Sequence, residues 1–293
     1  MELEKRIQGK VLRDEPLSKH TSFGIGGVAN YYCKPKDEGD VRTLLSFVRE
    51  TRIGLKILGN GTNILFQDDG FRGMVMENPF RHWSIEEDVV TAGAATPLAI
   101  LISATVQRGL GGLEPLSGIP GSVGGALITN AGTVAGEISQ PFLSLRAFDL
   151  DGNPVELKGE EVQFVYRKST LPKPLLIKEV SFQLTPKDPG ESEAIVRDLL
   201  RRRKETQPTR VKNVGCIFKN PDGDHAGRII DVLGLKGFRC GNAEISRVHG
   251  NFIVNRRGAT AKDVVELIQL IRDRVLQERG ISLELEIEIV GID

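Results

Sequence analysis

The chain has 293 residues, 40% of them hydrophobic, which is enough for about two folded domains with ordinary cores. Its 39 Lys and Arg residues balance 39 Asp and Glu residues, so a nucleic-acid-binding protein that relies on a long-range positive field is excluded. The three cysteines form no CxxC pair, which favours reduced thiols and a cytoplasmic protein, and no apolar run is long enough to cross a membrane.

The first elements in chain order argue against a Rossmann nucleotide site. The pattern GxGxxA at Gly24–Ala29 nominally matches a dinucleotide fingerprint, but the residues that follow, Asn30–Cys33, read as a strand instead of the required helix. The segment 37–52 has apolar residues on one face and predicts a helix, and a strand follows at Leu55–Leu58.

A first glycine-rich loop comes directly after that strand. Asn and Gly tolerate left-handed backbone conformations, and a threonine adds a hydroxyl donor. The loop consists of Gly59, Asn60, Gly61, Thr62 and Asn63. Short strands are predicted at 74–76 and 88–92, and Thr96 is expected to cap a helix that has Pro97 at its first position and ends near Arg108.

The stretch 109–132 is the richest in glycine and holds eight of them. Ser122 is predicted to be the N-cap of a short helix reaching about residue 131. A glycine turn that leads into a helix suits a pyrophosphate, whereas a tightly packed turn without ligand is the alternative. The presence of the earlier loop favours the first interpretation, in which both loops hold one diphosphate.

Beyond this stretch the pattern predicts a hairpin from 143–150 and 155–157, a strand at 175–184, and a linker at 185–192. Ser192 is expected to cap a helix that ends in the basic run Arg201–Lys204. This run either is a solvated last turn that complements the helix dipole or contacts a diphosphate.

Further helices are predicted at 226–233 and from Thr260 to Gly280, with a strand at 251–255 between them. The segment 281–289 alternates strictly between apolar and polar residues and predicts a final strand. Glu286 is the middle one of three glutamates on its polar face, so the pattern alone indicates a solvated side chain.

Several single residues are candidates for chemistry, each with an ordinary alternative. Arg167 suits a carboxylate or a phosphate, but most arginines are surface residues. Cys216 reads first as a small buried hydrophobe, and Lys219 and Asn220 as a polar turn. No two histidines have metal-ligand spacing, so no metal site is predicted. The residues alone indicate a two-domain α+β protein with a nucleotide diphosphate site in its first half.

An ordered set of motifs resembles one enzyme family. The motifs are TSFGIGG from Thr21, LGNGTN from Leu58, GIPGSVGGA from Gly118 with NAG from Asn130, YR at Tyr166, GCIFKNP from Gly215, SRVHGNFIVN from Ser246 and LELEIEIVG from Leu283. In this order they are similar to the UDP-N-acetylenolpyruvoylglucosamine reductases of bacterial peptidoglycan synthesis. The resemblance extends from about His20 to Gly291.

The resemblance implies an α+β fold with an FAD-binding unit of two subdomains, like that of vanillyl-alcohol oxidase, and then a C-terminal substrate domain. We place these parts at 1–57, 58–186 and 192–293. An alternative is that the last strand returns to the first domain. No long insertion follows Arg167, so the chain resembles the shorter subtype with a more open site. The resemblance leaves the oligomeric state open.

The implied reaction uses NADPH to reduce FAD, which then reduces UDP-N-acetylglucosamine enolpyruvate to UDP-N-acetylmuramate. The resemblance assigns the FAD contacts to the two glycine loops. They are Gly59, Asn60, Gly61, Thr62, Asn63, Gly118, Ile119, Pro120, Gly121, Ser122, Gly124, Gly125, Ala126, Asn130 and Gly132.

The implied catalytic residues are Arg167 and Glu286, which stabilise the enolate, and Cys216, which donates the proton. Many members of the family have serine at the position of Cys216, and this departure is the main one. Tyr166, Lys219 and Asn220 match substrate-binding residues. The residues that hold the UDP end are open, with Arg201–Lys204, Arg210 and Arg256 as candidates.

Two other functions compete with this interpretation. One is a hydroxy-acid or lactone oxidase built on the same FAD-binding unit, whose glycine loops would look alike. The motifs around Cys216 and Glu286 argue against it. The other is a non-catalytic nucleotide-binding homologue, which the replacement at Cys216 favours and the retained Arg167 and Glu286 disfavour.

Overall fold

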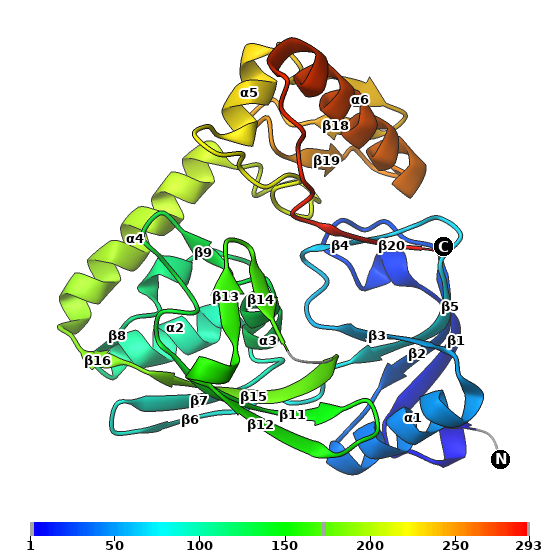
Figure 1. Cartoon of the computed structure of the whole chain (residues 1–293), viewed down its shortest axis with the longest axis vertical. Helices are drawn as coiled ribbons and strands as arrows, with labels where there is room; N and C mark the ends of the chain where they lie inside the picture. Colours follow the sequence, from blue (N-terminus) through cyan, green and yellow to red (C-terminus); the bar gives the residue numbers. More distant parts are fainter. Residues whose placement is uncertain (1–2, 172–173, 292–293) are drawn as a thin grey trace. The chain divides into compact units, whose positions relative to one another are not determined.

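The computed structural model describes residues 3–171 and 174–291, in which strands and helices are mixed as the α+β class requires. Its backbone contacts divide the chain into two compact units, each made of three segments (Figure 1). The first unit is Met1–Arg13, Tyr31–Asn60 and Gly73–Arg201, and the second is Asp14–Asn30, Gly61–Arg72 and Arg202–Asp293. The predicted boundaries at 57 and 186 stay a prediction.

The N-terminal third forms a sheet in the order β1-β2-β5-β3. Its strands are β1 (Lys10–Pro16), β2 (Val28–Lys34), β3 (Gly54–Leu58) and β5 (Phe71–Glu77). Helix α1 (Glu38–Thr51) follows β2, and the Asp37 carboxylate caps it by accepting from the Asp40 amide at 3.0 Å. The predicted strand at Asn30–Cys33 and the helix at 37–52 are therefore confirmed.

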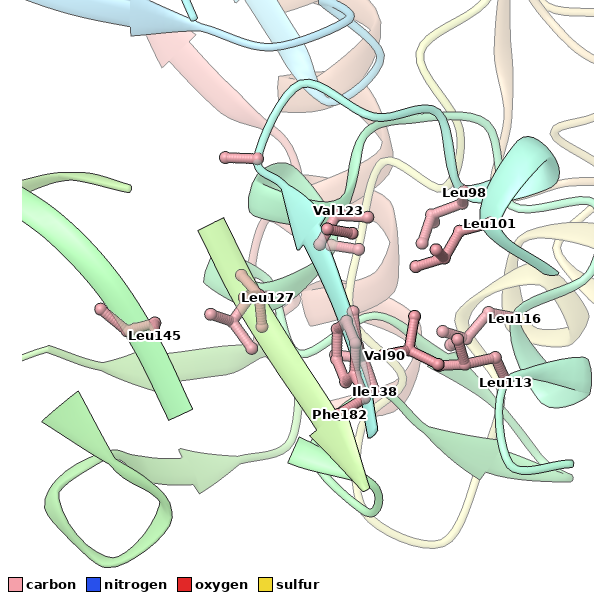
Figure 2. Close-up of a cluster of buried hydrophobic side chains, with 14 of the residues drawn as sticks. Val90, Leu98, Leu101, Leu113, Leu116, Val123, Leu127, Ile138, Leu145 and Phe182 are labelled. Atoms are coloured by element: carbon pink, nitrogen blue, oxygen red, sulfur yellow. The ribbon is translucent and has the colours of Figure 1, made fainter. Parts of the chain in front are cut away.

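An antiparallel five-stranded sheet in the order β12-β11-β15-β7-β6 carries the main core of the first unit. Its strands are β6 (Trp83–Glu86), β7 (Val89–Gly93), β11 (Phe142–Asp149), β12 (Pro154–Lys158) and β15 (Leu175–Gln183). Helices α2 (Leu98–Gln107) and α3 (Val123–Ile128) bury apolar side chains against it, as Figure 2 shows. The labelled side chains are Val90, Leu98, Leu101, Leu113, Leu116, Val123, Leu127, Ile138, Leu145 and Phe182.

Two predicted helix starts are wrong. Pro97 is the N-cap of α2, and the Thr96 hydroxyl instead donates to the His82 carbonyl at 2.8 Å. Helix α4 (Pro189–Thr206) begins before Ser192, because the Asp188 carboxylate accepts from the Glu191 amide at 3.0 Å. Ser192 is buried within the helix, and part of the predicted linker is helical.

The second unit contains a small sheet and two helices. Its sheet has the order β17-β18-β19, and its helices are α5 (Ala226–Val232) and α6 (Ala261–Arg279). Thr260 caps α6 and Gly280 ends it in a left-handed conformation, as predicted. The strands are β17 (Arg239–Cys240), β18 (Ala243–Ile245) and β19 (Ile253–Asn255).

The final strand is shorter than the alternation predicts. Only β20 (Glu288–Val290) is regular, and it pairs in parallel with β4 (Ile64–Phe66). Before it, the extended backbone pairs with an irregular segment through single bonds, such as Glu286 N–H to Ile217 O at 2.9 Å. The alternation still sets burial, because Leu283 and Ile287 are buried.

Several short elements complete the described chain. They are β8 (Leu110–Gly111), β9 (Gly132–Thr133), β10 (Gly136–Glu137), β13 (Gln163–Val165), β14 (Lys168–Thr170), β16 (Thr185–Pro186) and the 3-10 turns Leu3–Lys5, Leu17–Lys19, Glu114–Leu116 and Gly159–Glu161. Among the helices of residues 3–171 and 174–291, none has the length and apolar character needed to span a membrane.

Candidate active site

The start of the first glycine-rich loop, Gly59 and Asn60, belongs to the first unit, where Gly59 meets the second loop. A Cβ atom built on Gly59 would lie 2.7 Å from the Ser122 Oγ, a distance that real Cβ contacts do not reach. Ser122 is the N-cap of α3, as predicted, and its hydroxyl accepts from the Gly125 amide at 3.4 Å. The end of β3 therefore lies against the start of α3, and the absence of a side chain at Gly59 permits this approach.

Helix α3 ends at Ile128, before the predicted end near residue 131. Asn130 adopts a left-handed conformation with φ of 42°, and the Ala131 amide donates back to the Ala126 carbonyl at 2.8 Å. The Asn130 side chain is buried and donates through Nδ2 to the Val165 carbonyl at 3.1 Å. The second glycine loop is thus joined to the hairpin that carries Arg167.

Arg167 lies at the tip of the hairpin formed by β13 and β14 (Figure 1). Its backbone is left-handed with φ of 58°, and its Nη1 donates to the Gly132 carbonyl at 2.9 Å. The guanidinium stands 5.3 Å from the ring centroid of Tyr166, which is about half exposed. All of these residues belong to the first unit.

The segments of Cys216 and Glu286 come together in the second unit. The Glu286 amide donates to the Ile217 carbonyl at 2.9 Å, and the Asn63 side-chain amide donates to the Glu286 carbonyl at 3.2 Å. Asn63 thus fixes the backbone of the glutamate segment. Cys216 and Glu286 are both half-buried.

Glu286 differs from its two neighbours on the same face. It is half-buried, whereas Glu284 and Glu288 are exposed. The side chain of Glu284 is 75% exposed and pairs with Lys219, whose Nζ lies 3.1 Å from its carboxylate. The solvated environment expected from the alternation therefore holds for Glu284 and Glu288 but not for Glu286.

Asn220 has a structural role that sequence reasoning missed. Its side-chain oxygen accepts from the Ala226 amide at 3.1 Å and so caps α5. The formal N-cap residue, His225, provides no side-chain hydrogen bond of this kind. The spacing between Asn220 and the helix is longer than in an ordinary capping box, so no local sequence pattern marks this cap.

Comparison with known proteins identifies the family. A model of the C-terminal domain of UDP-N-acetylenolpyruvoylglucosamine reductases matches residues 207–290, and a model of an FAD-binding domain matches residues 29–158. The chain is 41% identical over 293 residues to the UDP-N-acetylenolpyruvoylglucosamine reductase of Moorella thermoacetica, with 99% of this chain and 96% of that protein covered. The chain belongs to the UDP-N-acetylenolpyruvoylglucosamine reductase family.

Other members of the family agree over the same length. The enzyme of that name from Bacillus pumilus is 37% identical, with 99% of this chain and 96% of that protein covered. The crystal structure of UDP-N-acetylenolpyruvylglucosamine reductase from Thermus caldophilus has a TM-score of 0.84 and 37% identity, with 97% and 99% of the two chains covered. The protein is therefore an FAD-containing oxidoreductase, and its expected α+β fold with an FAD-binding part and a C-terminal domain is confirmed.

The glycine loops of this reductase offer polar groups that fit a cofactor with a diphosphate. Two buried side-chain oxygens, Ser117 Oγ and Asn130 Oδ1, flank the second loop and have no hydrogen-bond partner among the described residues. Several loop amides donate to no group of residues 3–171 and 174–291, among them those of Gly59, Asn60, Gly118 and Gly121. Unpaired amides and buried oxygens of this kind suit the phosphates and polar edges of FAD.

Two of the candidate basic residues of the reductase, Arg201 and Arg256, have acidic partners. Arg201 pairs with Asp198 at 2.7 Å, and Arg256 pairs with Glu244 at 2.8 Å. Glu244 is fully buried in β18 and also lies 2.5 Å from Arg239. The Arg256 guanidinium, with that of Arg239, holds the pKa of the Glu244 carboxyl below its usual range. Sequence reasoning missed this cluster, because the strand pairing and the following turn, and not a helical or strand period, bring Arg239 and Arg256, 5 and 12 residues away in the chain, to Glu244.

Proposed function

We propose that this protein reduces UDP-N-acetylglucosamine enolpyruvate to UDP-N-acetylmuramate in the cytoplasm, with NADPH as reductant and as a step of peptidoglycan precursor synthesis. Similarity to the named reductases over nearly the whole chain supports this function. The observation that carries it is the pairing of the Cys216 segment with the half-buried Glu286. Both segments lie within residues 207–290, which match the C-terminal domain of the reductases, and this argues against a hydroxy-acid oxidase.

The chain's own residues bind and orient the reactants. FAD, when bound, would supply the hydride chemistry that links NADPH to the enolpyruvyl double bond. The glycine loops hold the cofactor through backbone amides, because their missing side chains let phosphates approach. We assign this binding to the fifteen residues from Gly59 to Asn63, Gly118 to Ser122, Gly124 to Ala126, Asn130 and Gly132.

Three side chains handle charge and protons. The Arg167 guanidinium, which is always charged, stabilises the carboxylate end of the enolate that develops in the reaction. Glu286 assists this stabilisation from its half-buried position. Cys216 donates a proton through its thiol to the neighbouring carbon, in the place of the expected serine.

We assign substrate binding to Tyr166, Lys219 and Asn220. The Lys219 ammonium suits a phosphate as a compact positive charge. Because the Asn220 side-chain oxygen caps α5, we assign the substrate contact to its amide nitrogen. Its backbone position is thereby fixed by the fold.

Anaerobic visible spectroscopy of the purified protein tests this function. We expect bound oxidised flavin, loss of its absorbance with NADPH, and rapid return of the oxidised spectrum when UDP-N-acetylglucosamine enolpyruvate is added. Loss of absorbance without return would remove this substrate and favour an oxidase. A flavin that NADPH does not reduce would favour a non-catalytic homologue, and failure to bind FAD would contradict the assignment of both loops.

A further inference from the structure

The turn that follows α3 holds the tip of the β13–β14 hairpin through two hydrogen bonds. The Asn130 Nδ2 donates to the Val165 carbonyl at 3.1 Å, and the Arg167 Nη1 donates to the Gly132 carbonyl at 2.9 Å. These two hydrogen bonds run in opposite directions between the same two segments. The residue before the tip and the side chain at the tip are thus both tied to one turn.

Backbone strain lies on both sides of this contact. Asn130 has φ of 42° and Arg167 has φ of 58°, and both are in the left-handed region. Asparagine tolerates this region, but it is unfavourable for an arginine. The hairpin has a two-residue turn whose second position favours glycine. Arg167 stays in this conformation only if its surroundings hold it there.

Glu137 fixes the orientation of the Asn130 side chain, which holds the hairpin. The Asn130 Nδ2 donates to the Glu137 Oε2 at 2.8 Å, in addition to its bond with the Val165 carbonyl. The side-chain amide nitrogen of asparagine carries two hydrogens, and these two acceptors use both of them. Both acceptors therefore require that Nδ2, and not Oδ1, faces them. The orientation of the buried Asn130 amide is therefore determined by these two partners.

The position of Glu137 is fixed in turn by the short ladder of β9 and β10. Glu137 is the register partner of Gly132 in this ladder. A Cβ atom on Gly132 would lie 2.6 Å from the Glu137 Cγ, so the two backbones are in close contact. Gly132 also provides the carbonyl that receives the Arg167 guanidinium. Glu137, Asn130 and Gly132 therefore form one interlocked support.

We propose that Asn130 and Glu137 are positioning residues that set the place and orientation of the Arg167 guanidinium. They act by holding the strained hairpin tip through the Val165 carbonyl. This inference rests on the proposed function, in which Arg167 stabilises the enolate. It predicts that their loss slows the substrate half of the reaction more than it slows flavin reduction by NADPH.

The test uses Asn130→Asp, a near-isosteric change that removes both donors and brings a second carboxylate to Glu137. Because Asn130 also belongs to the FAD-binding loop, both half-reactions are measured per bound flavin, and we expect flavin reoxidation by the enolpyruvyl substrate to slow about tenfold more than flavin reduction by NADPH. In Asn130→Asp combined with Glu137→Gln, the new amide donates to the new carboxylate, but the Val165 carbonyl still lacks its donor, so we expect reoxidation to stay slow. Ser169→Ala is the matched control, because it removes a 3.0 Å bond from the same hairpin to the Ile128 carbonyl and leaves the tip in place.

A double-mutant cycle separates positioning from general damage. If Asn130 acts through Arg167, Asn130→Asp has little further effect in an Arg167→Ala background. An equal slowing in both backgrounds would overturn the proposal. Wild-type reoxidation in Asn130→Asp would overturn it as well.

Hydrogen exchange gives a readout that does not depend on turnover. We expect amides of 163–170 to exchange faster in Asn130→Asp than in wild type, and those of α6 to be unchanged. Unchanged exchange at the hairpin would overturn the proposal even if activity fell. If wild-type flavin is not reoxidised by the substrate, the proposed function fails, while the exchange result still decides whether Asn130 holds the hairpin.

Discussion

Gly59 stands directly against the Ser122 hydroxyl, so that a methyl group on Gly59 would be 2.7 Å from the oxygen that caps α3. Two loops far apart in the sequence are brought together by this contact. The loop amides of Gly59 and Gly121 donate to no group among the described residues, although backbone amides in folded proteins are nearly always paired. The contact therefore brings unused donors from both loops into one region of the first unit.

Gly59→Ala tests the role of this contact in cofactor binding. The methyl group must displace Ser122 Oγ, which disturbs the cap and the start of α3. We expect the affinity for FAD to fall about tenfold, which corresponds to about 1.4 kcal/mol, as measured by fluorescence titration of the apoprotein. Gly159→Ala is the control, because its Cβ would lie 3.5 Å from the nearest atom, an ordinary contact. Equal FAD affinity in both variants would show that the contact does not matter for the cofactor.

Glu286→Gln tests the difference among the three glutamates. Because Glu286 is half-buried and Glu288 is exposed on the same face, only the first is expected to act on the substrate. We expect kcat to fall about a hundredfold in Glu286→Gln, since charge stabilisation of this kind is commonly worth that much. Glu288→Gln should keep kcat within about twofold. Similar losses in both variants would return Glu286 to a general structural role.

Elements with strong local signals were predictable from the sequence. Both α1 and α6 have an apolar face and a capping residue, Asp37 and Thr260, and the structure places the caps there. The start of α4 was not predictable in the same way. Ser192 and Asp188 are both possible caps, and burial of Ser192 against Glu114 decides between them, with a 2.8 Å hydrogen bond.

The candidate site was predictable only in part for a similar reason. The glycine content of 109–132 predicts that another group packs closely against this stretch, and Gly59 packs against Ser122. The hold of Asn130 on Val165 joins residues from separate elements, and nothing local in either segment marks it. The same applies to Glu244 and its arginines. Contacts that depend on the tertiary fold leave no periodic pattern, so sequence reasoning has no means to find them.

Cys216→Ser and Cys216→Ala together test the proton donor. Serine retains a hydroxyl that can donate a proton, and we expect Cys216→Ser to turn over within about tenfold of wild type. Alanine has no proton to give, so flavin reoxidation by the substrate should slow about a hundredfold or more while NADPH reduction stays unchanged. Single-turnover absorbance measurements separate the two steps. Full activity in the alanine variant would exclude Cys216 as the acid.

Glu244 predicts how stability responds to acid. Its carboxylate is fully buried, pairs with Arg256 at 2.8 Å and Arg239 at 2.5 Å, and has a pKa lowered from an ordinary value near 4.5. A carboxyl whose pKa is lower in the folded state stabilises the protein fully above the unfolded value. This contribution is lost as the pH falls from 4.5 through the folded pKa, because the unfolded chain takes up the proton first.

Glu244→Gln removes this contribution and leaves the arginines without a charged partner. We expect the free energy of unfolding to fall by about 1–2 kcal/mol near neutral pH, because the Glu244 carboxylate is buried but the Arg256 and Arg239 side chains are 43% and 59% exposed. Because the variant has already lost the titrating group, its stability should fall less than that of wild type between about pH 5 and about pH 3. Urea unfolding across this range measures both effects. Glu284→Gln is the control, since that side chain is 75% exposed, and a variant at 244 with the same acid dependence as wild type would contradict the assignment.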